Sequence, residues 1–312
     1  MLLPGDLAWV RQQEGPGGPG STSHWRGVSV GIDVEPLRPA DLPETGEFLH
    51  RNLNERVPAD AWSAALDVPW ATPQPNHGFV LRAEGAVAGV LLAFYSDREI
   101  AGRVERFCNL GAWCVLPDHR LHSLRLLRAA LGQDGYTFTD LSPSGAVVPL
   151  NTRLGFTTLD TTTMLVPCIP YPPLGRTRLS ASTATFRERL TRSERRVLDD
   201  HAGAPAVHAV LLEHPDGHCL VLYRRDRRRG LPLFASVLYA SNPALFATVA
   251  PRLAGHVAVR HRVAALLVER RVADPPALAV QLRRARPKMF RSNTVAADQI
   301  DNLYSELCCV EW

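Results

Sequence analysis

The stretch that most constrains the fold spans residues 114–131 and reads CVLPDHRLHSLRLLRAAL. The short apolar run 111–115 predicts a strand, which Pro117 and Asp118 end. From Ser123 onward, leucines recur at helical spacing. The stretch therefore predicts a strand, a tight loop and a helix. Because the first amides of a helix have no partner within it, such a junction favours an anion.

Three basic side chains reinforce this character of the loop, namely His119, Arg120 and His122. A phosphate would interact with these side chains as well as with the positive end of the helix dipole. The alternative is a solvated strand-to-helix turn without a ligand. These residues alone do not separate the two.

Together with the downstream segment NTRLGF at 151–156, the loop resembles the acetyl-CoA pyrophosphate motif of the GCN5-related N-acetyltransferase (GNAT) superfamily. The family's usual motif has glycines where this chain has Ser123 and Arg125. A serine at a helix start can cap it, and an arginine can pair with phosphate. The resemblance implies that acetyl-CoA or another acyl-CoA binds as a co-substrate. Its expected contacts are Cys114, Val115, His119, Arg120, His122, Ser123, Leu124 and Arg125.

The expected elements between residues 30 and 168 follow the order of that family. Hydrophobic patterns predict a strand at 34–39, helices at 40–53 and 58–66, a hairpin at 77–96, a polar turn at 97–103, a strand at 104–115, the helix described above, a strand at 136–141, a helix at 144–154 and strands to 166. Asn109 and Gly111 indicate a bulge or a close backbone approach near the middle of the long strand.

A similar order returns after the proline-rich segment PCIPYPPL at 167–174. Helices are expected at 190–198, 242–256 and 276–282, a hairpin at 206–224 and strands at 231–240 and 263–269. An amphipathic helix at 296–307 would end the chain. The second strand-to-helix junction, 239–243, has no basic or glycine-rich loop, so we expect no CoA binding there.

The predicted fold class is therefore α/β (α+β), with two GNAT-like domains that each hold a mixed, mostly antiparallel sheet flanked by helices. The predicted ranges are a flexible tail at 1–28, an acyl-CoA-binding domain at 29–168, a proline-rich linker at 169–176 and a second, degenerate GNAT-like domain at 177–312 with a C-terminal helix.

Transfer of an acyl group from a thioester to an amine needs a neutral amine, a polarised carbonyl and a proton for the leaving thiolate. The resemblance implies a carboxylate base on or near the long strand, and here Glu105 is the candidate, with Asp140 as the alternative. Asn151 stands where the family has a tyrosine, and it can donate a hydrogen bond but not a proton. The first hypothesis is therefore an N-acyltransferase, and the second is a catalytically silent GNAT-fold binding or regulatory protein.

The composition and the charge distribution of the chain limit the kinds of partner that we expect. The six cysteines show no metal-ligand spacing, and neither a leader-like start nor a long apolar span is present, so we expect a cytoplasmic protein without a metal or a membrane. Residues 1–171 carry a net charge of −5 and residues 172–312 one of +9. The basic runs 224–229 and 283–291 lack interleaved aromatics, which disfavours a nucleic acid. The expected partner is a small-molecule or peptide amine, and a homodimer stays open.

Overall fold

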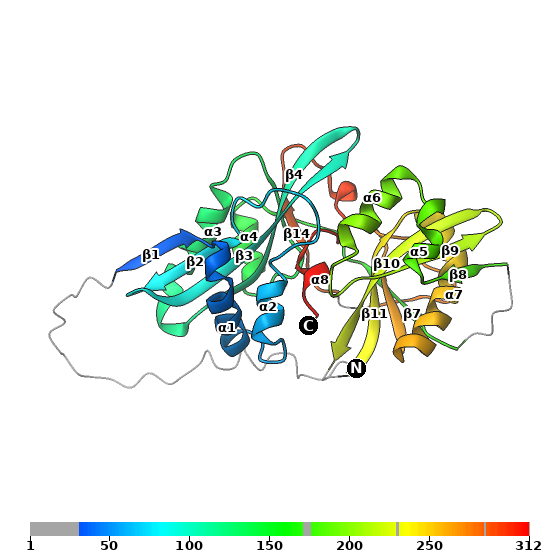
Figure 1. Cartoon of the computed structure of the whole chain (residues 1–312), viewed down its shortest axis with the longest axis horizontal. Coiled ribbons are helices and arrows are strands. Elements are labelled where there is room, and N and C mark those ends of the chain that lie inside the picture. The colour runs from blue at the N-terminus through cyan, green and yellow to red at the C-terminus, as the bar shows by residue number, and fades with distance from the viewer. Residues whose placement is uncertain (1–30, 171–175, 229–230, 284, 312) are drawn as a thin grey trace. The chain divides into compact units, whose positions relative to one another are not determined.

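Two seven-stranded sheets organise the computed structural model, which describes residues 31–170, 176–228, 231–283 and 285–311 (Figure 1). The predicted tail at 1–28 and the centre of the predicted linker, 171–175, lie outside the described residues. No helix in the described part of the chain is long and apolar enough to cross a membrane.

The first sheet has the strand order β1-β2-β3-β4-β5-β14-β6. Its strands are β1 (Ile32–Pro36), β2 (Gly78–Ala83), β3 (Ala86–Ile100), β4 (Arg103–Val115), β5 (Thr137–Asp140), β6 (Thr157–Thr158) and β14 (Met289–Arg291). Strands β1 to β4 form an antiparallel series, and β4 pairs with β5 in parallel. The polar turn expected at 97–103 is wrong in its length. The β3–β4 hairpin extends to Ile100 and Arg103, and only Ala101 and Gly102, both with positive φ, form the turn.

The helices of this half are the 3-10 helix η2 (Pro39–Asp41), α1 (Leu42–Asn52), α2 (Ala59–Ala64), the 3-10 helix η3 (Pro117–His122), α3 (Ser123–Leu131) and α4 (Val147–Arg153). Helix α3 is the crossover between the parallel strands β4 and β5. Its Leu126, Leu127 and Ala130 are buried at helical spacing against the sheet. The strand, loop and helix predicted for 111–131 are confirmed.

The second sheet has the order β8-β9-β10-β11-β12-β7-β13. Its strands are β7 (Thr163–Pro167), β8 (Arg178–Ser180), β9 (His208–His214), β10 (Gly217–Arg228), β11 (Leu231–Ala240), β12 (Ala265–Glu269) and β13 (Val280–Gln281). Its helices are α5 (Thr183–Phe186), the 3-10 helix η4 (Arg187–Arg189), α6 (Arg192–His201) and α7 (Pro243–His261). As in the first sheet, a hairpin leads to a strand that a helix connects to a parallel neighbour, here β11, α7 and β12.

The two sheets exchange one strand each. Strand β7 lies within the predicted range 29–168 but pairs with β12 and β13 of the second sheet. Strand β14 lies within the predicted range 177–312 but pairs with β5 and β6 of the first sheet. Each predicted range therefore supplies an interior strand to the sheet of the other. The sequence did not show this, because alternation predicts that a segment is a strand and not which sheet it joins.

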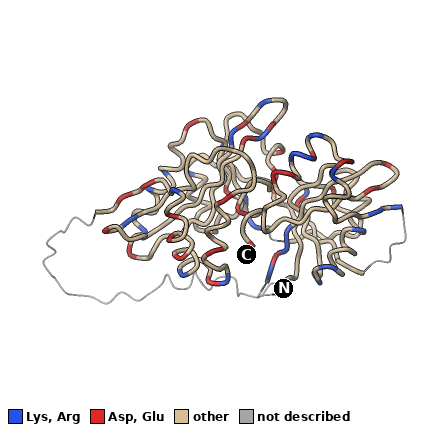
Figure 2. Tube along the Cα trace, in the orientation of Figure 1, with Lys and Arg blue, Asp and Glu red and all other residues tan. Residues whose placement is uncertain are grey.

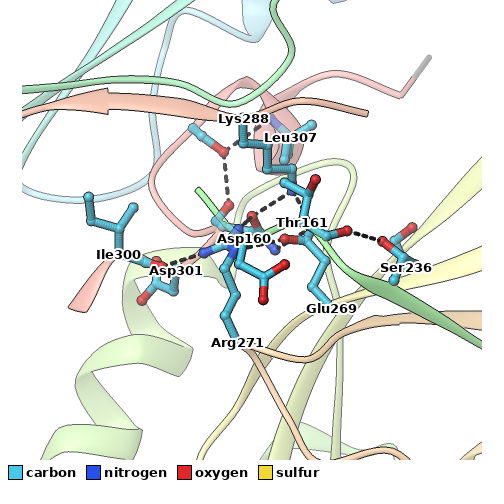
Figure 3. A network of polar contacts seen from close by, with 12 residues as sticks. Asp160, Thr161, Ser236, Glu269, Arg271, Lys288, Ile300, Asp301 and Leu307 are labelled. Atoms are coloured by element: carbon cyan, nitrogen blue, oxygen red, sulfur yellow. Dashed lines mark hydrogen bonds and ion pairs between the residues drawn. The ribbon is translucent and has the colours of Figure 1, made fainter. Parts of the chain in front are cut away.

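A buried ionic network joins the end of β12 and the residue before β14 to the C-terminal segment (Figure 3). Glu269, at the end of β12, accepts hydrogen bonds from Lys288 Nζ and from Arg271 Nε, the latter at 2.8 Å. Lys288 Nζ also donates to Asn302 Oδ1 at 2.7 Å, and Arg271 donates to the Ile300 carbonyl. Burial lowers the pKa of Lys288, while the Glu269 charge opposes that shift. Because these charges are buried, each depends on the others for compensation.

Two predicted helices are wrong. Residues 276–282 contain β13 instead of a helix. The expected terminal helix at 296–307 is a 3-10 turn, η5 (Ala297–Gln299), followed by an irregular segment and α8 (Glu306–Cys309). Ile300 and Leu303 are buried as their spacing suggests, but the backbone between them is not helical. Within this segment Ser305 Oγ donates to the Asn302 carbonyl at 2.9 Å, while the Tyr304 amide donates to the distant His201 Nε2 at 3.2 Å.

Candidate functional site

The first sheet splits where β4 and β5 part. The two strands pair in parallel from Phe107 to Leu110 on β4 and from Thr137 to Asp140 on β5. Beyond that point β5 ends, while β4 continues to Val115 along β3 alone. We call this end of the β4–β5 pairing the split.

A bulge in β4 lies at the mouth of the split. The register shifts between Val90 and Leu92 of β3, which pair with Cys114 and Gly111, and Ala112 has a φ of 47°. The bulge expected near Asn109 and Gly111 is thereby confirmed. Such an irregularity interrupts the ladder of hydrogen bonds and redirects the backbone amides.

The C-terminal segment closes the split with a glutamate. A Cβ at position 111 would lie 3.2 Å from the Glu306 Cβ, which is closer than ordinary van der Waals contact, so the absence of a side chain at Gly111 favours this approach. Glu306 is completely buried, and its amide donates to Asn109 Oδ1 at 3.3 Å. Its Oε1 accepts a hydrogen bond from Ser142 Oγ at 2.6 Å, and its Oε2 has no partner among the described residues. Burial raises the pKa of Glu306.

A second buried carboxyl group stands beside it. Asp140, the last residue of β5, accepts a hydrogen bond from Asn151 Nδ2 at 2.9 Å. Burial and the Glu306 charge raise the pKa of Asp140 to about 7, although the Asn151 hydrogen bond opposes the shift. Asn151 is 1% exposed, and no described residue donates to its Oδ1. The split thus holds two proton-accepting groups and unpaired acceptor atoms.

The predicted anion loop is more closed than a glycine-rich loop. It folds as η3 and continues directly into α3, so α3 has no free N-terminus. The His119 amide donates to the Leu116 carbonyl at 3.0 Å, and the Ser123 amide donates to the Arg120 carbonyl. These two amides are therefore not available to a phosphate.

The side chains of the loop divide into two groups. Arg125 Nη1 donates to the Ile32 carbonyl at 2.9 Å, which ties this arginine to β1. Arg120 is exposed, while His119 and His122 are half-buried. Burial raises the pKa of the Cys114 thiol to about 11, partly offset by the Arg120 charge, so Cys114 is a neutral thiol near pH 7. Val115 and Leu124 are half-buried beside the loop.

Glu105 lies away from the split. Glu105 precedes Leu110 by five residues on the extended strand β4, which corresponds to about 16 Å along the strand. Its Oε2 accepts a hydrogen bond from Thr294 Oγ1 at 2.7 Å. The structure brings Asn151 to the split but not Glu105. Of the carboxyl groups at the split, Asp140 was the alternative base in the sequence analysis. Glu306 was missed because it lay in the expected amphipathic helix at 296–307.

Some residues of the two basic runs, 224–229 and 283–291, are buried. Arg224 is 2% exposed, forms an ion pair with Asp226 at 2.9 Å and donates to the Leu307 carbonyl at 2.8 Å. Basic and acidic residues are interspersed along the trace in both sheets (Figure 2). No group of three potential ligand side chains within the described residues is placed to hold a metal ion.

No protein-family model matches the chain, and no curated protein matches it in sequence. Among solved structures, a GCN5-related N-acetyltransferase from Anabaena variabilis superposes with a TM-score of 0.56 at 12% identity, over 83% of this chain and 72% of that one. A probable N-acyltransferase from Enterococcus faecalis gives a TM-score of 0.53 at 14% identity, over 84% and 72%. A putative acetyltransferase from Pyrococcus horikoshii gives 0.52 at 12% identity, over 91% and 96%.

At sequence identities of 12–14%, the similarity to these solved structures shows a shared fold and nothing more. The chain therefore has the fold of the GCN5-related N-acetyltransferases, and the α+β class with two mixed sheets is confirmed.

Proposed function

We propose that this chain is an acyl-CoA-dependent N-acyltransferase, most simply an acetyltransferase, which transfers the acyl group directly to an amine. The observation that carries the proposal is the buried carboxyl pair Asp140 and Glu306 in the split of a GNAT fold. A buried carboxyl group with a raised pKa is a suitable general base near neutral pH. The acceptor is a small-molecule or peptide amine.

In this proposal the acyl carbonyl lies beside the β4 bulge at Gly111 and Ala112. Backbone amides redirected by the bulge would polarise it, and the amine would attack from the side of Glu306. The carbon–nitrogen bond forms as the carbon–sulfur bond breaks. Glu306 takes the amine proton and then gives a proton to the CoA thiolate, so that the carboxylate is restored. Ser142 and Asn151 orient the two carboxyl groups through their hydrogen bonds.

Side chains rather than loop amides would hold the CoA pyrophosphate. Arg120, His119 and His122 border the loop, and an arginine forms charge-assisted hydrogen bonds with phosphate oxygens. Because Arg125 already bonds to Ile32, it would contribute charge more than a direct contact. The remaining predicted contacts, Cys114, Val115, Ser123 and Leu124, would form the wall of the split. The expected cytoplasmic location stays a prediction, and a homodimer stays open.

Two observations favour a second candidate, a non-catalytic GNAT-fold binding or regulatory protein. The Glu306 side chain occupies the space next to Gly111. The His119 and Ser123 amides donate hydrogen bonds to carbonyl groups of the chain. Because residues of the chain itself fill the split, the fold is complete there without a bound co-substrate.

The test of the first candidate is release of CoA thiol from acetyl-CoA with a panel of primary amines. Glu306→Gln keeps the shape of the side chain and removes the base, so kcat should fall about 100-fold or more with little change in acetyl-CoA affinity. Glu105→Gln is the matched control and should retain activity. Binding of acetyl-CoA without transfer to any amine would favour the second candidate, and no binding at all would contradict the first.

A further inference from the structure

A second polar cluster lies in the other sheet, between its strands and the C-terminal half of α7. His208 on β9 pairs directly with Tyr223 on β10, and Arg225 follows two residues later on the same face of the strand. On helix α7, Arg252, His256 and Arg260 recur every four residues, and the helix ends at His261. The Arg260 charge acts on all three histidines, and the Arg252 charge acts on His256.

The rings of this cluster are close together. The His208 and His261 centroids are 4.7 Å apart, and those of His256 and His261 are 6.5 Å apart. Tyr223 Oη and His261 Nε2 are 2.9 Å apart and share a hydrogen bond. Burial, together with the neighbouring charges, lowers the pKa of His261 to about 4, so this imidazole is neutral near pH 7.

Three buried nitrogen atoms of the cluster have no partner. They are His208 Nε2, Arg225 Nε and Arg252 Nε, and no described residue forms a hydrogen bond with any of them. A buried guanidinium N–H without an acceptor is unfavourable by about 1–3 kcal/mol, so an unmet donor of this kind indicates a missing acceptor.

The charges around these atoms are mainly positive. Arg225, Arg252 and Arg260 each act on one or more of the three histidines. The acid described beside them is Glu311, which pairs with Arg225 Nη2 at 3.1 Å. One carboxylate against three guanidinium groups leaves the cluster with an excess of positive charge.

We infer that this cluster, formed by His208, Arg225, Arg252, His256, Arg260 and His261, binds a phosphate group. The unpartnered nitrogen atoms come from two strands and a helix. A phosphate suits such an arrangement because it offers acceptor oxygens in several directions. The phosphate is either free inorganic phosphate or the terminal group of a small phosphomonoester. The site lies in the second sheet and is distinct from the split, so it does not depend on the acyltransferase proposal.

The test is calorimetric titration of the full chain with inorganic phosphate and, separately, with O-phosphoethanolamine, at pH 7 and constant ionic strength. Arg252→Gln should weaken phosphate binding about tenfold or more, the loss of one charge-assisted hydrogen bond. Glu311→Gln should tighten it, because the substitution removes the carboxylate that competes for Arg225. Tighter binding of O-phosphoethanolamine than of phosphate would identify a phosphomonoester as the ligand, and equal or weaker binding would identify the free ion.

Arg178→Gln is the matched control. Arg178 is exposed on β8, and in the strand register it lies opposite Glu213 of β9. Glu213 is five residues along β9 from His208. Its replacement should leave the affinity unchanged. Should Arg252→Gln fail to fold, the exposed Arg260→Gln tests the same site. Absence of phosphate binding to the wild-type chain, or equal affinity in the cluster variant and the Arg178 control, would overturn the inference.

Discussion

At the scale of residues, the buried carboxyl pair decides what the split can do. The Glu306 charge raises the pKa of Asp140, and both carboxyl groups are buried. Two such groups do not both ionise readily near neutral pH, so the pair holds a proton that a carboxylate in water would have lost. Their partners, Ser142 and Asn151, fix the orientation of the oxygens.

This proton should make stability depend on pH. Because the folded pKa of Asp140 is about 7, above that of an unfolded aspartate, the folded chain keeps a proton between about pH 4 and 7 that the unfolded chain releases. The free energy of unfolding should therefore fall as pH rises through this window, by at most about 4 kcal/mol. Asp140→Asn should remove this part of the dependence. Urea denaturation at pH 4.5 and 7.5 measures it.

The exposed Asp134→Asn provides the control, since it should leave the pH dependence as in the wild type. If Asp140→Asn and the wild type lose stability equally between pH 4.5 and 7.5, the raised pKa is wrong.

At the scale of elements, the β4 bulge and the C-terminal segment fit each other. The sequence predicted β4, α3 and a bulge near Gly111, because strand alternation, helical spacing and an interior glycine are local signals. It did not predict that α8 contacts β4, since that contact joins positions nearly 200 residues apart. The spacing of Ile300, Leu303 and Leu307 indicated a helix at 296–307; Ile300 and Leu303 are buried as that spacing requires, but the backbone is irregular.

Gly111→Ala tests this fit. The new methyl group would meet the Glu306 side chain at 3.2–3.4 Å, so this buried side chain must move by a few tenths of an ångström. We expect a loss of stability of about 1–3 kcal/mol, which thermal or urea unfolding would show.

Gly145→Ala is the control, because a Cβ there meets nothing within 4 Å. It should change stability by less than about 0.5 kcal/mol. An equal effect of the two substitutions would mean that Glu306 does not pack against Gly111.

At the scale of the whole molecule, strand exchange makes the two sheets depend on each other. The sequence predicted two successive domains from repeated element order, and that order is present in both sheets. The sequence could not show that β7 and β14 change places, because each has an ordinary strand pattern and its partners lie in the other half of the chain. The hydrogen bond from Lys288, the residue before β14, to Glu269 on β12 connects the two sheets at this point.

A fragment of residues 29–168 should therefore not fold, since β14 is missing between β5 and β6. The full chain should unfold in a single cooperative transition rather than in two. Circular dichroism of the fragment and calorimetry of the full chain measure both. A folded, monomeric fragment would contradict the dependence of the two sheets on each other.

The network itself should be sensitive to loss of one partner. Lys288→Met leaves Glu269 with fewer compensating charges in a buried site, so the free energy of unfolding should fall by about 3 kcal/mol. A double-mutant cycle with Glu269→Gln should show coupling between the two positions. Additive effects would mean that the pair does not interact.

The acyltransferase account is tested most directly by hydrogen exchange of the full chain with and without acetyl-CoA. The account predicts that acetyl-CoA slows exchange over residues 111–123 and changes it over residues 305–310, and that Arg120→Ala abolishes both effects. Unchanged exchange in both segments at saturating acetyl-CoA would contradict it.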